Sequence, residues 1–188
     1  MKTEMKLLLL CNYLNLFGFG LFTPIYAIFV LGLGGTAFEA ASSWALYGLI
    51  TGGSILFFGR LEDSSFNKHK LVVVGYFAAA AGALAFHFVE NLTQFYIALA
   101  VNALALGILL PAWKALYTRY EDRGAEAGEW SLFDGGNYIS AAIAALAGGY
   151  LITLYGFKSL FLSMFAIQIL AGFVSIKLLK GKVKKKAR

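Results

Sequence analysis

The chain has 188 residues, of which 60% are hydrophobic, 16% aromatic and 14% charged, and its formal net charge is +6. An ordinary soluble domain is about 45–50% apolar and about 25% charged, so this composition excludes that class. We expect an integral membrane protein.

Six apolar segments follow one another along the chain. Crossing the hydrocarbon core takes roughly 20 mostly apolar helical residues. The apolar runs are continuous, whereas barrel strands alternate in segments of about ten residues, so we predict an all-α integral membrane fold with six transmembrane helices. Connections and ends are short, which predicts a single six-helix membrane domain over residues 1–188 with no soluble domain attached. The expected spans are 7–31, 38–58, 71–88, 95–117, 131–153 and 159–179.

The first segment, 7–31, is predicted to be a membrane span and not a cleavable signal peptide. It is too long, it carries two asparagines, and no small-x-small cleavage site stands at its end. Polar residues are expensive in lipid and usually face a cavity or another helix. The residues that share one face of this predicted helix are Asn12, Asn15, Phe19, Phe22 and Tyr26.

The other polar candidates gather in three later segments, whereas 71–88 and 159–179 are nearly devoid of them apart from Gln168. For each residue singly, an interhelical hydrogen bond is the commoner role, because Asn, Ser and Thr often join membrane helices. The alternative is a shared polar cavity. The candidates are Trp44, Tyr47, Thr51 and Ser54 in 38–58, Asn102 and Trp113 in 95–117, and Asp134, Asn137 and Ala141 in 131–153.

Small residues form stripes on two segments. Such stripes let helix backbones approach closely, either within one subunit or between two. They consist of Gly48 and Gly52 on 38–58, and of Ala141, Ala145 and Gly149 on 131–153.

Charged residues inside the spans are few. Lys114 and Asp134 stand at similar distances from the connection between 95–117 and 131–153, so we expect that they can form an ion pair. No carboxylate lies near a predicted midplane, where proton-coupled carriers commonly place a relay. The sequence therefore does not favour strong proton coupling, and Asp134 is the best candidate for it.

Lysine and arginine predict the orientation, because they concentrate in cytoplasmic connections. Only Lys158 falls on the other side, so we expect both termini to be cytoplasmic and the protein to lie in the plasma (inner) membrane. This asymmetry explains the net charge without nucleic acid. The tail "KGKVKKKAR" has the composition to contact anionic lipid headgroups, although a topological anchor is the simpler role. The cytoplasmic set is Lys2, Lys6, Arg60, Lys68, Lys70, Lys114, Arg119, Arg123, Lys177, Lys180, Lys182, Lys184, Lys185, Lys186 and Arg188.

Enzymatic interpretations find no support in the sequence. His69 and His87 are predicted on opposite sides of the membrane, which excludes a two-histidine metal site within one chain. Cys11 is the single cysteine, so no disulfide or thiolate metal site forms within one chain. There is no glycine-rich phosphate loop and no serine elbow. We expect no enzyme activity, no metal and no cofactor.

The charged connection "GRLEDSSFNKHK" resembles the signature loop of the major facilitator superfamily, Gly-x-Leu-x-Asp followed by a small residue and a basic cluster. Gly59, Leu61 and Asp63 match this pattern. Phe66 stands where the family usually has a second glycine, and Ser64 where it often has arginine.

Three later stretches extend the resemblance over most of the chain after residue 45. "YEDRGAEAGEW" resembles the acidic-Arg-Gly segment between the family's fourth and fifth helices, with Arg123, Gly124 and Gly128 matching. "GGNYISAAIAALAGGYLITLYGFKSLF" is similar to the fifth helix, with its paired glycines Gly148 and Gly149. "LLPAWKALYTRY" resembles the end of the fourth helix. Their order, spacing and membrane side agree with the family.

The resemblance implies that this chain is one half of a transporter. Family members usually have twelve helices in two six-helix halves of the same orientation, with the substrate site between them. Two parallel copies restore that arrangement, so we expect a homodimer that moves a small solute by alternating access. A heterodimer with a separate half, or a truncated chain, is an alternative. The second hypothesis is a non-transporting scaffold or accessory half that pairs with another membrane protein.

The resemblance also implies roles for individual residues. In the family, the helices equivalent to 7–31, 38–58, 95–117 and 131–153 line the central cavity, and those at the small stripes meet across the halves. A cavity of Asn and aromatic residues would suit a neutral or amphipathic solute. The signature aspartate latches onto a helix start of the opposite half in the family, so Asp63 would meet residues 132–136 of a partner. A solvated loop that only fixes topology is the alternative. The expected latch comprises Gly59, Leu61, Asp63 and Arg123.

Overall fold

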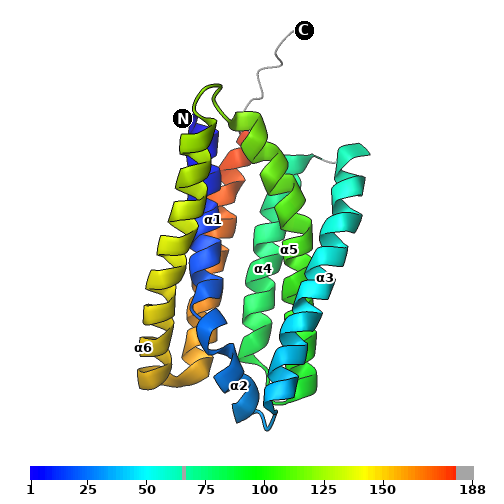
Figure 1. Ribbon diagram of the computed structural model, residues 1–188, viewed down its shortest axis with the longest axis vertical. Helices are drawn as coiled ribbons and strands as arrows, with labels where there is room; N and C mark the ends of the chain where they lie inside the picture. Colours follow the sequence, from blue (N-terminus) through cyan, green and yellow to red (C-terminus); the bar gives the residue numbers. More distant parts are fainter. Residues whose placement is uncertain (65–66, 181–188) are drawn as a thin grey trace.

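Long helices run side by side along the main axis of the molecule (Figure 1). The computed structural model describes residues 1–64 and 67–180, without the side chains of residues 62–64 and 180. Five helices in this part of the chain are long and apolar enough to cross a membrane, which confirms a helical membrane fold. The elements are α1 (Thr3–Gly20), η1 (Thr23–Ile25), α2 (Tyr26–Gly32), α3 (Ala37–Ser64), α4 (Lys68–His87), α5 (Leu92–Tyr120), α6 (Glu126–Ser175) and η2 (Ile176–Lys180).

The predicted fifth and sixth spans lie in the 50-residue element α6, in which two helices meet at a kink. A straight helix of that length measures about 75 Å, against a hydrocarbon core of about 30 Å. At Gly156 the backbone leaves helical geometry with φ 75° and ψ 177°, a conformation that glycine adopts without the clash of a Cβ. Residues 126–155, the first arm, and 157–175, the second arm, run in opposite directions (Figure 1). The count of six membrane-spanning helices is not confirmed, because five candidate spans are found in the described residues, with both arms of α6 counted as one.

The predicted first span is interrupted. α1 ends at Gly20, and the chain continues through η1 into α2. Pro24 lies in η1, and proline supplies no backbone N–H to continue a helix. The hydroxyl of Thr23 donates instead to the carbonyl of Phe19 at 3.0 Å. The predicted span 7–31 falls within the candidate membrane span Thr3–Gly32, whose helix is broken at this point.

The start of α1 and the end of η2 lie at the same end of the bundle, which we call the terminal end (Figure 1). Lys2 joins α1 to the α5–α6 turn there. Its ammonium donates to the carbonyls of Tyr120 at 2.8 Å and Glu121 at 3.1 Å, and pairs with Asp122 at 2.8 Å. The hydrogen bond from Lys2 holds the pKa of Asp122 below its ordinary value. The start of the chain is thus fixed to the turn between α5 and α6.

Two clusters of buried apolar side chains fill the bundle. One occupies the terminal end, with Met5, Leu8, Tyr76, Trp113 and Leu116 among its members. The other occupies the opposite end and includes Phe22, Phe29, Phe86, Phe95 and Phe161. The candidate site lies between the two clusters.

Candidate functional site

A small pocket with a mainly apolar lining and three side-chain amides lies about halfway along the helices. Its volume is about 80 Å³, and α1, α3, α4, α5 and the second arm of α6 all contribute to its wall. We call it the amide pocket, after Asn15, Asn102 and Gln168. Its lining residues are Asn15, Leu16, Phe19, Tyr47, Ala79, Asn102, Leu106 and Gln168.

Glycines let neighbouring helices approach these amides closely. A Cβ added at Gly82 of α4 would lie 3.0 Å from the amide nitrogen of Asn102. A Cβ added at Gly18 of α1 would lie 2.8 Å from Cγ of Gln168. Such distances are shorter than ordinary contacts, so the two amides are held in place by the backbones opposite them.

The amide pocket contains hydrogen-bonding groups that no other described residue satisfies. Asn102 and Gln168 are 4% and 1% exposed. Oδ1 of Asn15, Nδ2 of Asn102 and Oε1 of Gln168 are buried without a partner among the described residues. Nε2 of Gln168 donates to the backbone carbonyl of Asn15 at 3.4 Å. Because a buried polar group without a partner costs about 1–3 kcal/mol, three such groups in one pocket mark a place where water or a solute binds.

Four aromatic rings lead from the amide pocket toward the end opposite the termini. We call Phe19, Tyr47, Trp44 and Tyr26 the aromatic ladder. Phe19 and Tyr47 stack at 5.7 Å and 16°, and Tyr47 and Trp44 at 5.6 Å and 22°. Trp44 and Tyr26 follow at 5.2 Å and 30°. Offset stacking of this kind is favourable, and Trp44 remains 42% exposed, so the ladder keeps aromatic surface accessible.

Part of the predicted cavity set meets in this site. The structure brings Asn15, Phe19, Tyr47 and Asn102 to the amide pocket and places Tyr26 on the aromatic ladder. Thr51 lies one helical turn beyond Tyr47 and is buried.

Gln168 is the site residue that the predicted cavity set omits. Its segment, 159–179, was expected to lie outside the cavity. The one available signal was that Gln168 carries the single side-chain amide of that segment.

Asn12 and Asn137 are brought together, but at another place. Nδ2 of Asn12 donates to Oδ1 of Asn137 at 2.6 Å, which joins α1 to the first arm of α6. Neither residue lines the amide pocket. Both therefore have the interhelical hydrogen-bonding role that was the alternative to a cavity.

We expect Asn12→Leu and Asn137→Leu each to lower stability by about 1 kcal/mol, the usual size of a hydrogen bond between membrane helices. The double variant should lose less than the sum of the single losses, because one bond is shared. Thermal unfolding of the four proteins in the same detergent tests this coupling. Strictly additive losses would show that the two amides do not interact.

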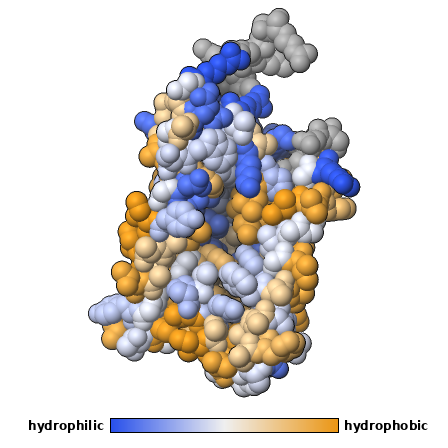
Figure 2. Space-filling view, viewed as in Figure 1, coloured by the Kyte–Doolittle hydropathy of each residue, from blue (hydrophilic) through white to orange (hydrophobic). Residues whose placement is uncertain are grey.

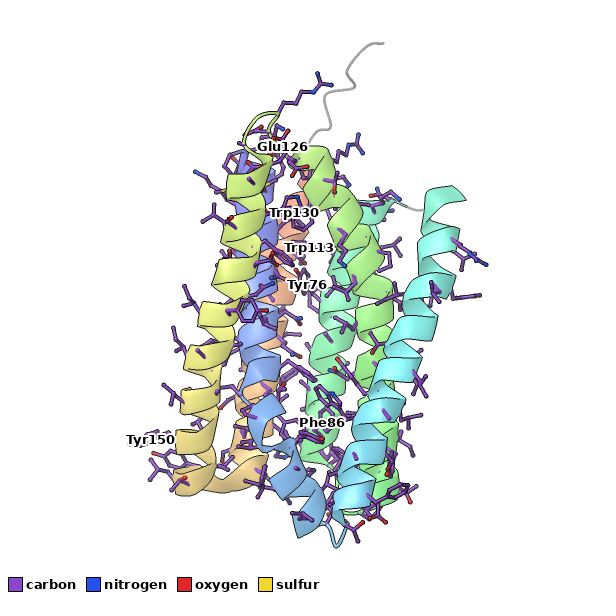
Figure 3. All side chains as sticks on the ribbon, viewed as in Figure 1. Tyr76, Phe86, Trp113, Glu126, Trp130 and Tyr150 are labelled. Carbon is purple, nitrogen blue, oxygen red and sulfur yellow. The ribbon has the colours of Figure 1, made fainter. Side chains whose placement is uncertain are left out.

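Trp113, expected in the cavity, belongs instead to the packed interior. It is 1% exposed, and its Nε1 donates to the carbonyl of Leu8 at 3.3 Å. Its ring lies 4.9 Å from the rings of both Tyr117 and Phe133. Figure 3 shows Trp113 and Trp130 projecting into the space between α5 and the first arm of α6. The cavity assignment of Trp113 is therefore wrong.

The expected ion pair between Lys114 and Asp134 is absent from the described residues, among which Asp122 pairs with Lys2 and with the amino group of Met1. The rings of Trp113, Tyr117 and Phe133 occupy the contact between α5 and α6. Lys114 directly follows Trp113, and Asp134 directly follows Phe133. Because the two rings point into the helix contact, the charged side chains next to them point away from it and are exposed.

The expected latch residues lie at the terminal end. Gly59 and Leu61 are in the last turns of α3, and the side chain of Asp63 lies outside the described residues. Arg123 is exposed in the α5–α6 turn. It lines a polar depression of about 500 Å³ together with Lys2, Thr118, Arg119, Glu121, Asp122 and Glu126.

The small stripes differ in what they contact. A Cβ added at Gly48, Gly52 or Gly149 would meet nothing within 4 Å, so these glycines do not serve packing inside the protomer. A Cβ on Gly20 would lie 3.7 Å from Cα of Ala141. Ala141 thus lies beside α1, in agreement with the alternative of packing within one subunit.

The face bordered by α3 and the first arm of α6 is polar along its middle. Figure 2 shows hydrophilic and intermediate residues running down the centre of this face, with a hollow partway along and hydrophobic patches on both sides. Tyr150 projects away from the bundle on the first arm (Figure 3) and is 68% exposed.

Comparison with known proteins identifies similar sequences and folds. The family model described as the Major Facilitator Superfamily matches residues 8–188. No curated protein matches the chain.

Three solved structures are similar in fold. A mutant of the peptide transporter POT has a TM-score of 0.81 and 21% identity, and the match covers 94% of this chain and 38% of that one. The POT family transporter PepTSo has a TM-score of 0.79 and 16% identity, with coverage of 96% and 38%. The peptide transporter POT in complex with sulfate has a TM-score of 0.82 and 20% identity, with coverage of 96% and 38%. At these identities the likeness shows the fold alone, and the chain spans 38% of the length of each.

Proposed function

Because this chain belongs to the major facilitator superfamily, we propose that it is a secondary transporter of a small solute. It works as a parallel homodimer, each copy supplying one half of an alternating-access carrier. The observation that carries the proposal is the group of unpartnered amides in the amide pocket, which gives a membrane protein a place to bind a polar solute at mid-depth.

The proposed homodimer is supported by the likeness of this bundle to part of each similar transporter. The chain spans 38% of each similar transporter, and in this architecture the solute site lies between two halves of the same orientation. A second copy related by a twofold axis supplies the other half. The face bordered by α3 and the first arm of α6 is suited to meet it, because it has a polar centre (Figure 2) and unpartnered glycines at its margins.

The orientation follows from charge. Lys2, Arg60, Arg119 and Arg123 belong to the terminal end, and Lys158 to the opposite end. Under the positive-inside rule the terminal end is cytoplasmic. We place the protein in the plasma (inner) membrane on this basis. Asp63, with Gly59, Leu61 and Arg123, then lies on the side where the proposed latch would close the cytoplasmic entrance.

Uptake by proteoliposomes and the mass of the lipid-embedded protein test the proposal together. Light scattering corrected for lipid should give twice the 20.4 kDa chain mass, and vesicles containing the protein should accumulate a solute that protein-free vesicles exclude. A monomer without uptake would instead support an accessory half that pairs with another membrane protein.

Cysteine cross-linking should locate the interface. Gly48 lies eleven residues after Ala37, and Ala145 eleven residues before Gly156, so both are about 16 Å from the same end of the bundle. If α3 of one copy meets the first arm of its partner, a variant with Gly48→Cys and Ala145→Cys forms covalent dimers under mild oxidation. Cys11 is buried and does not react.

Val74→Cys is the matched control for cross-linking, because Val74 is 54% exposed on α4, which does not border the proposed interface. Equal cross-linking at Val74 would refute the interface.

A further inference from the structure

The amide pocket and the aromatic ladder form one continuous surface. Phe19 and Tyr47 line the pocket and are also the first two rings of the ladder. A solute held here therefore meets amide groups on one side and aromatic rings on the other. The combination restricts its chemistry in three ways.

Charge is the first restriction. None of the described residues that line the amide pocket is charged. A charged solute entering it would lose its hydration and gain no counter-ion, which is unfavourable in a site of low dielectric constant. Aromatic faces attract cations, but none of the described lining residues carries a carboxylate that would balance the charge of a cation. The surface therefore favours an uncharged solute.

Size is the second restriction. The amide pocket holds about 80 Å³, whereas a cavity that admits a benzene ring is about 150 Å³. The pocket thus accepts a carboxamide or a pair of hydroxyl groups but no ring. The ring of a solute has to lie outside the pocket, against the aromatic ladder, where stacking on aromatic side chains is favourable for any flat ring.

Hydrogen bonding is the third restriction. Oδ1 of Asn15 and Oε1 of Gln168 are free acceptors, and Nδ2 of Asn102 is a free donor. The two ends of an amide can be exchanged by a flip, so the pocket offers a mixture of donors and acceptors. An amide edge or adjacent hydroxyl groups complement such a mixture.

We propose that this surface binds an uncharged ring compound whose edge carries amide or hydroxyl groups, the chemistry shared by nucleosides and pyranosides. The proposal names the substrate class of the transporter proposed above, and it rests on that function for its biological meaning. Binding itself is measurable without transport.

Equilibrium dialysis of the nanodisc-embedded protein tests the proposal with four probes. Radiolabelled uridine and methyl glucopyranoside are the uncharged probes, and they distinguish a base ring from a sugar ring alone. Phenyltrimethylammonium and benzoate are charged ring compounds of similar size. We expect saturable binding of at least one uncharged probe, and at least tenfold weaker binding of both charged ones.

Substitutions assign the binding to this surface. Asn102→Leu and Gln168→Leu should each weaken binding of the uncharged probe about tenfold or more, since each removes a buried hydrogen-bonding group. Trp44→Ala should weaken it by removing a ring of the ladder, and as Trp44 is partly exposed this variant keeps the interior intact. Ser163→Ala is the control, because its hydroxyl donates to the carbonyl of Ser159 within the second arm, and it should leave binding unchanged.

Failure of this inference differs from failure of the transporter proposal. If neither uncharged probe binds, or if the charged probes bind equally well, the inference is wrong. If a solute is taken up by proteoliposomes but the Asn102 and Gln168 variants transport it normally, the site assignment is wrong and transport stands. Binding of an uncharged probe that depends on both amides, without uptake, would uphold the site and refute the transporter.

Discussion

Replacing Gly148 with alanine is expected to destabilise the protein strongly, whereas the same change at Gly149 should not. A Cβ on Gly148 would overlap the carbonyl oxygen of Leu21 and lie 2.8 Å from its carbonyl carbon. That carbonyl belongs to the break between α1 and η1, so backbone and not a movable side chain opposes the new atom. A Cβ on Gly149 would meet nothing within 4 Å.

Comparing Gly148→Ala with Gly149→Ala separates the effect of packing on stability from the effect of helix propensity. Both changes replace glycine with alanine inside one helix and gain up to about 1 kcal/mol from propensity. We expect Gly148→Ala to lose about 3 kcal/mol to overpacking, a fall in melting temperature of about 6–12 °C for a chain of this size, and Gly149→Ala to be neutral or slightly stabilising.

A maleimide dye that becomes fluorescent on reaction with a thiol measures both variants. Cys11 is the single cysteine and is fully buried, so it reacts when the bundle opens. Equal melting temperatures for the two variants would show that the first arm does not approach the α1 break as described.

Trp113→Ala is expected to be among the most damaging single changes. Trp113 is 1% exposed and packs against Tyr117 and Phe133, and truncating a buried aromatic residue costs about 3–5 kcal/mol. Trp113→Phe keeps a ring and loses the hydrogen bond to Leu8, so its loss should be smaller. The same thiol assay orders the three proteins.

The Trp113 experiment also separates two roles for this residue. A residue that lined a transport path would change solute affinity when truncated and leave the melting temperature nearly unchanged. We expect the reverse for Trp113→Phe, with a lower melting temperature and unaltered affinity for any transported solute.

The fold could be predicted from the sequence because a bilayer imposes simple requirements. Long apolar runs and basic connections reveal helices and their sides. The junction of the last two spans was predicted at 154–158, and the chain reverses there at Gly156. The break after Gly20 was not predicted, although Pro24 in the same segment is a residue that interrupts helices.

The site was predictable only in part, because a sequence gives the face of a helix and not what lies opposite at each depth. Asn102 and Trp113 are eleven residues apart, close to three full turns, and therefore share one face of α5. At Asn102 that face borders the amide pocket, whereas at Trp113 it meets Leu8 and Phe133. Gln168 was omitted for the same reason, since its neighbours come from other helices.

The reversal at Gly156 has a mechanical consequence. A polar loop between two spans is a flexible connection, so one helix can tilt while the next keeps its position. A single residue allows no such independent movement. Both arms of α6 also lie against α1, the first arm at Gly20 and the second at Gly18. We expect α1 and the two arms of α6 to rotate together as one rigid body about the end of the bundle at Gly156. The displacement of this body would then be greatest at the terminal end, beside the α5–α6 turn that Lys2 contacts.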